Sequence, residues 1–392
     1  MRLLASAVAV TASLGALLVG AVGSAPANAS PPDRLASAAA PPSPSVRVET
    51  LVTGLSIPWD LAFLPDGSFL FDQRGGITSL RNAQGVVRVV RTDQSDLVTG
   101  GEPGLLGLVV DPDFATNRLY YTCQTHLGSA GEANDVRVIR WQLAVDRTSA
   151  ARVGRPLVTG IPLGSFHAGC RLRFDSTGLL QVGTGDAGVG TNPQDLTSLG
   201  GKTLRVGRDG SIPADNPFRA RGGNAAYIYT YGHRNVQGLA LQPGTGRMWS
   251  AEHGPDRDDE INRLVAGGNY GWNPVPGYNQ TVPMTDLTLF PHAKVAKWSS
   301  GFPTLATSGA TFLRGKAWGP WEGALAVGLL KDSGVLLLKI GPQGQVTATS
   351  QLAAVDNTFG RIRTAQFGPG GALYLTTSND GGTDVILKVT PL

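Results

Sequence analysis

The stretch Pro58-Trp-Asp-Leu-Ala-Phe-Leu-Pro-Asp-Gly67, followed by Ser68-Phe-Leu-Phe71, carries the pattern that decides the fold. A short apolar strand enters a Pro-Asp-Gly turn and a second apolar strand follows, as in a β-hairpin. The same unit recurs five more times along the chain, and the fifth copy is the loosest. The further copies begin at Gly104, Arg171, Gly238, Ala310 and Thr364.

The spacing of these copies, roughly 50 to 70 residues, suits propeller blades with decorated loops and is too long for a solenoid. The chain contains 53 Gly and 26 Pro, which suits many short strands joined by turns, and 41% hydrophobic residues, enough for a core. Each blade needs about four strands. We therefore predict an all-β fold, a six-bladed β-propeller over residues 46–392. The early strand Val46–Val52 is expected to complete the last blade.

The N-terminal segment has the pattern of a secretory signal over residues 1–29, with Arg2 at its start, an apolar run and Ala27-Asn-Ala29 as a cleavage site. The apolar run is too short and Gly-rich for a membrane span. Residues 30–45, rich in Pro, Ala and Ser, predict a disordered spacer. The sequence thus predicts a secreted, extracellular protein.

The charge pattern argues against nucleic-acid binding, and the two cysteines favour a disulfide. The 33 basic and 29 acidic residues give a net charge of +4, without the basic run or basic-aromatic array typical of nucleic-acid binding. Cys123 and Cys170 lie in adjacent repeats. In an oxidising compartment an even count favours one disulfide, and two buried free thiols are the alternative.

Polar residues precede the inner strands of several copies. His167-Ala-Gly, Arg234-Asn235 and Arg361-Ile-Arg363 are far apart in sequence, yet loops that enter inner strands meet at one rim of a propeller. With Lys331, three of these arginines form a group of cations that suits an anionic ligand. Exposed surface charge is the alternative. His167 is a candidate general base, with a structural histidine as the alternative.

The stretch Tyr231-Gly-His-Arg-Asn-Val-Gln-Gly238 and the segment Glu252-His-Gly-Pro255 place an Arg-Asn pair and two Gly-containing turns around the fourth copy. We interpret them as the floor of a polar pocket. The carbonyl groups of Gly254 and Pro255 are candidate ligands of a hard cation such as Ca²⁺. The acidic run 256–260, with Asn269-Tyr270 downstream, is either a second cation site or a solvated turn.

Taken together, these motifs resemble the soluble pyrroloquinoline quinone (PQQ)-dependent sugar dehydrogenases, the glucose/sorbosone or aldose dehydrogenase family. The resemblance covers about Val46 to Leu392. Besides the stretches quoted above, it is carried by Gly104-Leu-Leu-Gly-Leu108, Asp111-Pro-Asp-Phe114, Gln194-Asp195, Leu199-Gly-Gly-Lys202, Ser211-Ile-Pro-Ala-Asp-Asn-Pro-Phe218, Asn269-Tyr-Gly-Trp272 and Gly360-Arg-Ile-Arg363.

The resemblance implies a six-bladed propeller and a role for each matching residue. His167 matches the catalytic base, and Arg234 the arginine beside the reacting quinone carbonyl. Gly254 and Pro255 match ligands of the Ca²⁺ that polarises PQQ. The residues that match cofactor contacts are Glu102, Gln194, Arg234, Asn235, Lys331, Arg361 and Arg363.

Three further positions complete these expectations. Glu260 and Tyr270 resemble a second, structural Ca²⁺ site, and Trp298 is expected to line the sugar pocket. Phe166 departs from the glucose-specific members, which carry an acidic residue beside the catalytic histidine. This change removes a polar contact from the cofactor or the base.

The sequence thus predicts a PQQ- and Ca²⁺-dependent enzyme that oxidises aldose sugars to lactones at the anomeric carbon. Its partners would be an aldose substrate and an electron acceptor that the sequence does not identify, and we expect a monomer or weak homodimer. Two alternatives stay open: a non-catalytic propeller that binds carbohydrate or protein, and a Ca²⁺-dependent lactonase-type hydrolase.

Overall fold

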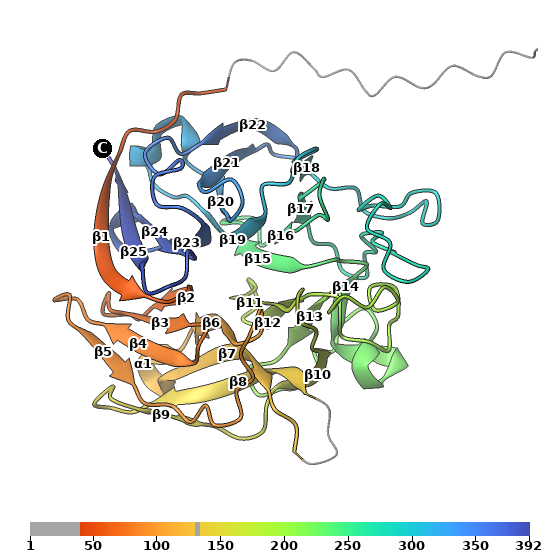
Figure 1. Cartoon of the computed structure of the whole chain (residues 1–392), viewed down its shortest axis with the longest axis horizontal. Coiled ribbons are helices and arrows are strands. Elements are labelled where there is room, and N and C mark those ends of the chain that lie inside the picture. Colours follow the sequence, from red (N-terminus) through yellow and green to blue (C-terminus); the bar gives the residue numbers. More distant parts are fainter. Residues whose placement is uncertain (1–39, 130–133) are drawn as a thin grey trace, which may run out of the picture. The chain divides into compact units, whose positions relative to one another are not determined.

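Short strands and Gly-rich turns build six small antiparallel sheets that surround a common centre (Figure 1). The computed structural model describes residues 40–129 and 134–392. The predicted signal segment 1–29 and spacer residues 30–39 lie outside the described residues. Within the described residues, no helix is long and apolar enough to cross a membrane.

The sheets follow one another along the chain as blades 1 to 6. Blade 1 contains β2 (Pro58–Phe63), β3 (Phe69–Gln73), β4 (Ile77–Arg81) and β5 (Val87–Val90). Blade 2 contains β6 (Leu105–Val110), β7 (Leu119–His126), β8 (Asp135–Leu143) and β10 (Val158–Pro162), with β9 (Ala150–Arg152) paired to β8. Blade 3 contains β11 (Gly169–Phe174), β12 (Leu180–Thr184), β13 (Lys202–Val206) and β14 (Ile228–Tyr231).

The remaining blades have the same antiparallel order. Blade 4 contains β15 (Val236–Leu241), β16 (Met248–Glu252), β17 (Glu260–Arg263) and β18 (Trp298–Ser299). Blade 5 contains β19 (Thr307–Phe312), β20 (Leu325–Leu329), β21 (Val335–Ile340) and β22 (Val346–Gln351). Blade 6 contains β23 (Ile362–Phe367), β24 (Leu373–Thr377), β25 (Asp384–Pro391) and β1 (Val46–Leu55).

Few helices interrupt the strands in residues 40–129 and 134–392. They are short turns: α1 (Phe114–Asn117), η1 (Arg219–Arg221), η2 (Gly223–Tyr227), η3 (Lys316–Trp321) and η4 (Pro369–Gly371). The six sheets confirm the predicted six-bladed β-propeller, and each hairpin read from the sequence becomes the first two strands of a blade.

The first strands of the six blades are neighbours around the centre. Each contacts the next, and β23 contacts β2, so the ring is closed. Glycine permits this close approach. A Cβ atom on Gly107 of β6 would lie 2.1 Å from the carbonyl oxygen of Cys170, and one on Gly238 of β15 would lie 2.2 Å from that of Ser308. The strand spacing at the centre therefore excludes any side chain at these two positions.

The N-terminal strand closes the ring. In Figure 1, β1 runs along β25, and the two pair antiparallel, with Val48 opposite Val389. This is the pairing expected for the early strand. Two residues that precede β1 also contact the propeller: the Trp321 indole donates to the Pro42 carbonyl at 2.8 Å, and the Ala353 amide donates to the Ser43 hydroxyl at 3.0 Å.

Candidate active site

The loops that enter β11, β15 and β23 carry the residues predicted to meet at one rim. His167 and Arg234 each lie two residues before an inner strand, and Arg363 is the second residue of β23. The three side chains are nearly buried, with 6%, 5% and 7% of their surfaces exposed. All three act electrostatically on the buried imidazole of His253, which places them around one centre.

His167 lies in a turn that glycine would favour. Its φ is +59°, and the following Gly169 and Cys170 have φ values of +59° and +75°. A non-glycine residue in this region costs roughly 1–3 kcal/mol and persists only where the surroundings impose it. Here the Gly169 amide donates to Asn235 Oδ1 at 3.1 Å, and the Ala168 amide donates to Glu102 Oε2 at 3.1 Å. The neighbouring residues thus impose the strained turn that orients His167.

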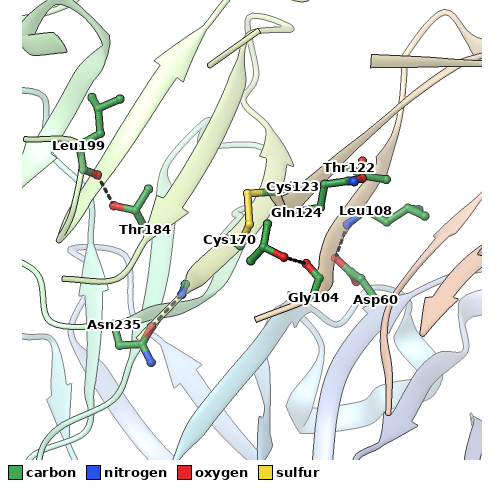
Figure 2. Close-up of a disulfide and its surroundings, with 12 residues drawn as sticks. Asp60, Gly104, Leu108, Thr122, Cys123, Gln124, Cys170, Thr184, Leu199 and Asn235 are labelled. Atoms are coloured by element: carbon green, nitrogen blue, oxygen red, sulfur yellow. Dashed lines mark hydrogen bonds between the residues drawn. A yellow bond between two sulfur atoms is a disulfide. The ribbon is translucent and has the colours of Figure 1, made fainter. Parts of the chain in front are cut away.

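A disulfide fixes the end of the same turn. Cys170 of blade 3 is joined to Cys123 on β7 of blade 2, which confirms the predicted pairing (Figure 2). Both cysteines are fully buried. In Figure 2 the Asn235 side chain reaches the backbone next to Cys170, where it accepts a hydrogen bond from the Gly169 amide. Three blades are therefore connected within a few residues of His167.

Asp186, which the sequence analysis did not single out, is the partner of His167. It follows β12 and lies fully buried, 2.7 Å from His167 Nδ1. The same carboxylate accepts hydrogen bonds from the Gly188 amide at 2.9 Å, the Trp272 indole at 2.9 Å and the Tyr278 hydroxyl at 2.7 Å. This donor set matches a carboxylate, which only accepts. The sequence feature that could have pointed to Asp186 is its position directly after the second strand of a hairpin, within the Gly-rich run 183–190.

Aromatic rings surround the imidazole. Phe166 packs edge-on against His167 with ring centroids 4.5 Å apart, and Tyr278 lies 6.0 Å from it. Phe166 is 40% exposed, so one face of this wall remains open to solvent. Phe166 thus places an apolar surface next to the candidate base.

Both the backbone amide and the guanidinium of Arg234 are hydrogen-bonded. Its amide donates to Glu252 Oε1, while His233 Nδ1 lies 2.7 Å from the other oxygen of that carboxylate. The guanidinium donates to the His253 carbonyl at 3.1 Å and to Gln280 Oε1 at 2.8 Å. It also lies over the Trp272 ring at 5.7 Å. Two residues of the Tyr231–Gly238 stretch, His233 and Arg234, are thus both held by Glu252.

Arg363 and Glu102 line a narrow hollow next to this turn, together with Trp59, Arg74, Leu106, Ala168, Gly169 and Gln237. Arg363 donates to Gln237 Oε1 at 3.0 Å. Burial lowers the pKa of Arg363 to about 9, an effect strengthened by nearby arginines and opposed by Glu102. Burial likewise lowers the pKa of His253 well below its usual range, and Arg234 adds to this effect. The hollow therefore disfavours further positive charge.

Several buried polar atoms around this centre have no partner among the described residues. They are three donors, Arg234 Nε, Asn235 Nδ2 and Arg363 Nε, and the ring nitrogen His253 Nε2. Buried polar atoms are normally paired, so an unpaired group needs a reason such as a ligand or an unseen water. Their clustering beside His167 points to a polar ligand that accepts hydrogen bonds.

Other predicted cofactor contacts lie elsewhere on the rim. The side-chain amides of Gln194 and Asn269 form two hydrogen bonds with each other, at 2.9 and 3.0 Å, and Gln194 Nε2 also donates to the Trp272 carbonyl. Lys331 is exposed, with its amine 3.3 Å from the Thr304 hydroxyl. Arg361 is exposed and donates to the Ser378 carbonyl at 3.1 Å. Trp298 packs against the apolar cluster that contains Trp249. The structure does not bring these four side chains into contact with His167.

Gly254 and Pro255 lie in the loop between β16 and β17. The Gly254 amide donates to Asp259 Oδ1 at 2.9 Å. Across residues 40–129 and 134–392, the backbone carbonyls of Gly254 and Pro255 receive no backbone hydrogen bond. Burial raises the pKa of Asp259, whose other oxygen accepts from two backbone amides. These free carbonyl groups suit an oxygen-seeking cation.

Glu260 and Tyr270 lie in the same blade. Glu260 accepts from Asn262 Nδ2 at 3.0 Å and from the Thr285 hydroxyl at 3.0 Å. Burial raises the pKa of Glu260 to about 8, and the neighbouring Glu252 adds to this effect. The Tyr270 hydroxyl donates to the Arg263 carbonyl at 2.7 Å. Asn262 Oδ1 lacks a partner among the described residues, so an oxygen beside Glu260 is free to bind a cation.

Two curated proteins are similar to this chain over much of its length. Aldose sugar dehydrogenase of Escherichia coli K12 is 32% identical over 356 residues, covering 88% of this chain and 93% of that protein. Quinoprotein glucose dehydrogenase B of Acinetobacter calcoaceticus is 32% identical over 255 residues, covering 59% and 53% of the two chains.

A solved structure and a family model are also similar to this chain. The PQQ-bound form of aldose sugar dehydrogenase from Streptomyces coelicolor is 30% identical, with a TM-score of 0.73 and coverage of 90% of this chain and 99% of that one. The family model described as Glucose / Sorbosone dehydrogenase matches residues 55–388. With this match across nearly the whole propeller, the chain belongs to the glucose/sorbosone dehydrogenase family.

Proposed function

We propose that this protein oxidises aldose sugars to lactones at the anomeric carbon, with PQQ as cofactor and Ca²⁺ as metal. The observation that carries the proposal is the pairing of a histidine, held by a buried carboxylate, with a cluster of unpartnered donors. The relatives named as aldose sugar dehydrogenase and as quinoprotein glucose dehydrogenase support it.

The residues present suit the cofactor. PQQ carries three carboxylates and quinone oxygens, all of which accept hydrogen bonds. Arg234 Nε, Asn235 Nδ2 and Arg363 Nε are buried donors that lack partners in the described structure. An anionic ligand would also favour the charged form of Arg363, whose pKa is lowered by burial and, to a smaller extent, by nearby arginines. PQQ, when bound, supplies a quinone that accepts the substrate's hydride.

The chain's own residues supply the remaining steps. His167 takes the proton of the anomeric hydroxyl, and Asp186 stabilises the imidazolium that forms. Arg234 stabilises negative charge that develops beside it. Phe166 offers an apolar face to the sugar ring. The carbonyl groups of Gly254 and Pro255 would hold Ca²⁺ beside the cofactor, and Glu260 and Tyr270 a second, structural Ca²⁺.

Gln194, Lys331 and Arg361 are proposed as further contacts to the cofactor carboxylates, and Trp298 as part of the sugar pocket. Lys331 and Arg361 are long, exposed side chains, and they would have to turn toward the site to reach it. The signal segment supports export, so we propose an extracellular enzyme, a monomer or weak homodimer, that passes electrons to an acceptor still to be identified.

The test is a titration of the purified apo-protein with PQQ and Ca²⁺, followed by dye reduction with a panel of aldoses. We expect saturable PQQ binding, reduction that depends on both sugar and Ca²⁺, and a lactone as the first product. Binding without reduction by any aldose would contradict the catalytic proposal and favour a binding propeller. Absence of PQQ binding would remove the cofactor as well.

A further inference from the structure

The loop between β17 and β18 reaches across to the candidate base. Its Tyr278 hydroxyl lies 2.9 Å from His167 Nδ1 and 2.7 Å from Asp186 Oδ2. The loop is docked on the turn that carries Asp186: a Cβ atom on Gly190 would lie 2.2 Å from the Gly277 carbonyl oxygen. Backbone contact therefore fixes where the tyrosine hydroxyl lies.

The hydrogen-bond donors and acceptors of Tyr278, Asp186 and His167 are compatible with one placement of the hydrogens. Burial and the Asp186 charge raise the pKa of Tyr278, so its hydroxyl keeps its single proton at working pH. That proton is donated to Asp186 Oδ2, and a lone pair of the phenol oxygen then faces His167 Nδ1. Asp186 Oδ1 faces the same nitrogen at 2.7 Å. Two acceptors on one ring nitrogen require that the nitrogen carries the hydrogen.

We propose that Tyr278 is a positioning residue that limits the pull of Asp186 on the Nδ1 proton of His167. Asp186 Oδ1, which only accepts, already requires the Nδ1–H tautomer. That tautomer leaves Nε2 with a free lone pair, the one atom of the ring that can remove a proton from substrate. This inference rests on the proposed role of His167 as base. The Trp272 indole donates a hydrogen bond to the same Asp186 oxygen and so also stabilises the carboxylate charge.

Groups on several elements face this imidazole. Asp186 and Tyr278 contact Nδ1, and Arg234 acts on Tyr278. His253 lies within electrostatic reach of His167. Glu102 binds the amide of the next residue. Replacing Tyr278 by Phe changes none of these charges. It removes one donor from Asp186, which makes that carboxylate a stronger partner for a protonated imidazole.

The experiment uses apo-protein labelled with ¹⁵N-histidine, and the His167 signal is assigned from its loss in His167→Gln. In the wild type we expect the Nδ1–H tautomer alone. In Tyr278→Phe we expect the Nδ1–H tautomer to persist, because Asp186 Oδ1 still faces Nδ1. We expect the titration midpoint to rise by about 1 pH unit, the low end for one hydrogen bond to a charged group. Tyr227→Phe, at the end of η2, is the matched control and should change neither.

Kinetics of the reconstituted enzyme give the second readout. The acid limb of the kcat pH profile should move up with the imidazole midpoint, while KM and PQQ affinity stay within about twofold of the wild-type values. An unchanged or lower midpoint in Tyr278→Phe overturns the inference. Because the NMR measurement needs neither sugar nor cofactor, failure of aldose oxidation would contradict the proposed function and leave the titration result standing.

Discussion

His167 combines two features that rarely occur together in a side chain with a purely structural role. Its backbone is held at a positive φ, and its ring nitrogen is hydrogen-bonded to a fully buried carboxylate. A structural histidine could be accommodated in an ordinary turn, without that strain. The arrangement instead fixes Nδ1 against Asp186 and leaves Nε2 for other contacts, as the proposed base requires.

Replacing His167 by Gln should separate catalysis from binding. We expect kcat to fall by about 10² to 10⁴, because general base catalysis contributes about this much. PQQ affinity should stay near that of the wild type, since the donors left unpartnered belong to other residues. Steady-state kinetics and a PQQ titration measure both. His292→Gln, at an exposed position, is the control. Equal loss of binding and turnover would contradict the role of base.

Arg363 and Glu102 should have opposite effects on cofactor binding. Removing the buried cation in Arg363→Gln should weaken PQQ binding by about 10- to 100-fold, the range for a hydrogen bond to a charged group. Glu102→Gln should tighten binding by about 2- to 10-fold, because the carboxylate competes with an anion for Arg363. Equilibrium titration of each apo-variant gives the comparison. Weaker binding in Glu102→Gln would mean that Glu102 contacts the cofactor directly.

Residue-level prediction from sequence succeeded where a residue belongs to a repeated position. His167, Arg234 and Arg363 all precede or begin an inner strand, so their convergence follows from the repeat alone. Asp186 and Tyr278 do not. Tyr278 comes from a loop without periodic pattern, and its contact depends on how that loop packs on the turn that carries Asp186. Loop packing of this kind leaves no signal in a single sequence.

At the level of elements, the turn into β11 is where strain, covalent linkage and chemistry coincide. Cys170 ends the turn and is bonded to β7, while Gly107 allows the backbones of blades 2 and 3 to touch beside it. The disulfide therefore has two separable effects. It restricts the unfolded chain, and it holds the end of the segment that orients His167.

The double variant Cys123→Ala/Cys170→Ala tests both effects. The bond closes a loop with a sequence separation of 47 residues, for which loop entropy gives a loss of about 4 kcal/mol in the free energy of unfolding. We also expect kcat to fall at temperatures where the variant is fully folded, because the strained turn loses an anchor. Denaturant unfolding and kinetics on the same samples provide the measurements. Wild-type kcat in a destabilised variant would limit the disulfide to stability.

Local hairpins explain why the fold could be predicted so far from the sequence. The first two strands of each blade are joined by short turns rich in Gly, Pro and Asp, and both strands are apolar, as in β2 and β3. Outer strands carry a weaker pattern because they are partly exposed. β5 has three exposed residues out of four, and β18 has only two residues, so neither stands out by composition.

For the whole molecule, closure of the ring decides how stability is shared. β1 comes from the start of the propeller and pairs along β25 near its end. Its buried residues Val52 and Leu55 join a cluster that includes Phe69 and Phe71 of blade 1 and Ile386 of blade 6. One strand therefore links the first and last blades and covers the edge that β25 would otherwise expose.

This linkage predicts that a lesion in β1 is felt by the entire ring. Leu55→Ala should lower the free energy of unfolding by about 2–5 kcal/mol, the range for truncating a buried leucine. Thr53→Ala, at an exposed position of the same strand, should change it by no more than about 0.5 kcal/mol. Calorimetry should still give one transition at lower temperature, with equal calorimetric and van't Hoff enthalpies, because each blade relies on its neighbours for its buried faces. A separate early transition, with the rest of the protein melting at the wild-type temperature, would show that blade 6 opens alone. In that case β1 would seal one blade locally, and the geometry around His167 would not depend on closure of the ring.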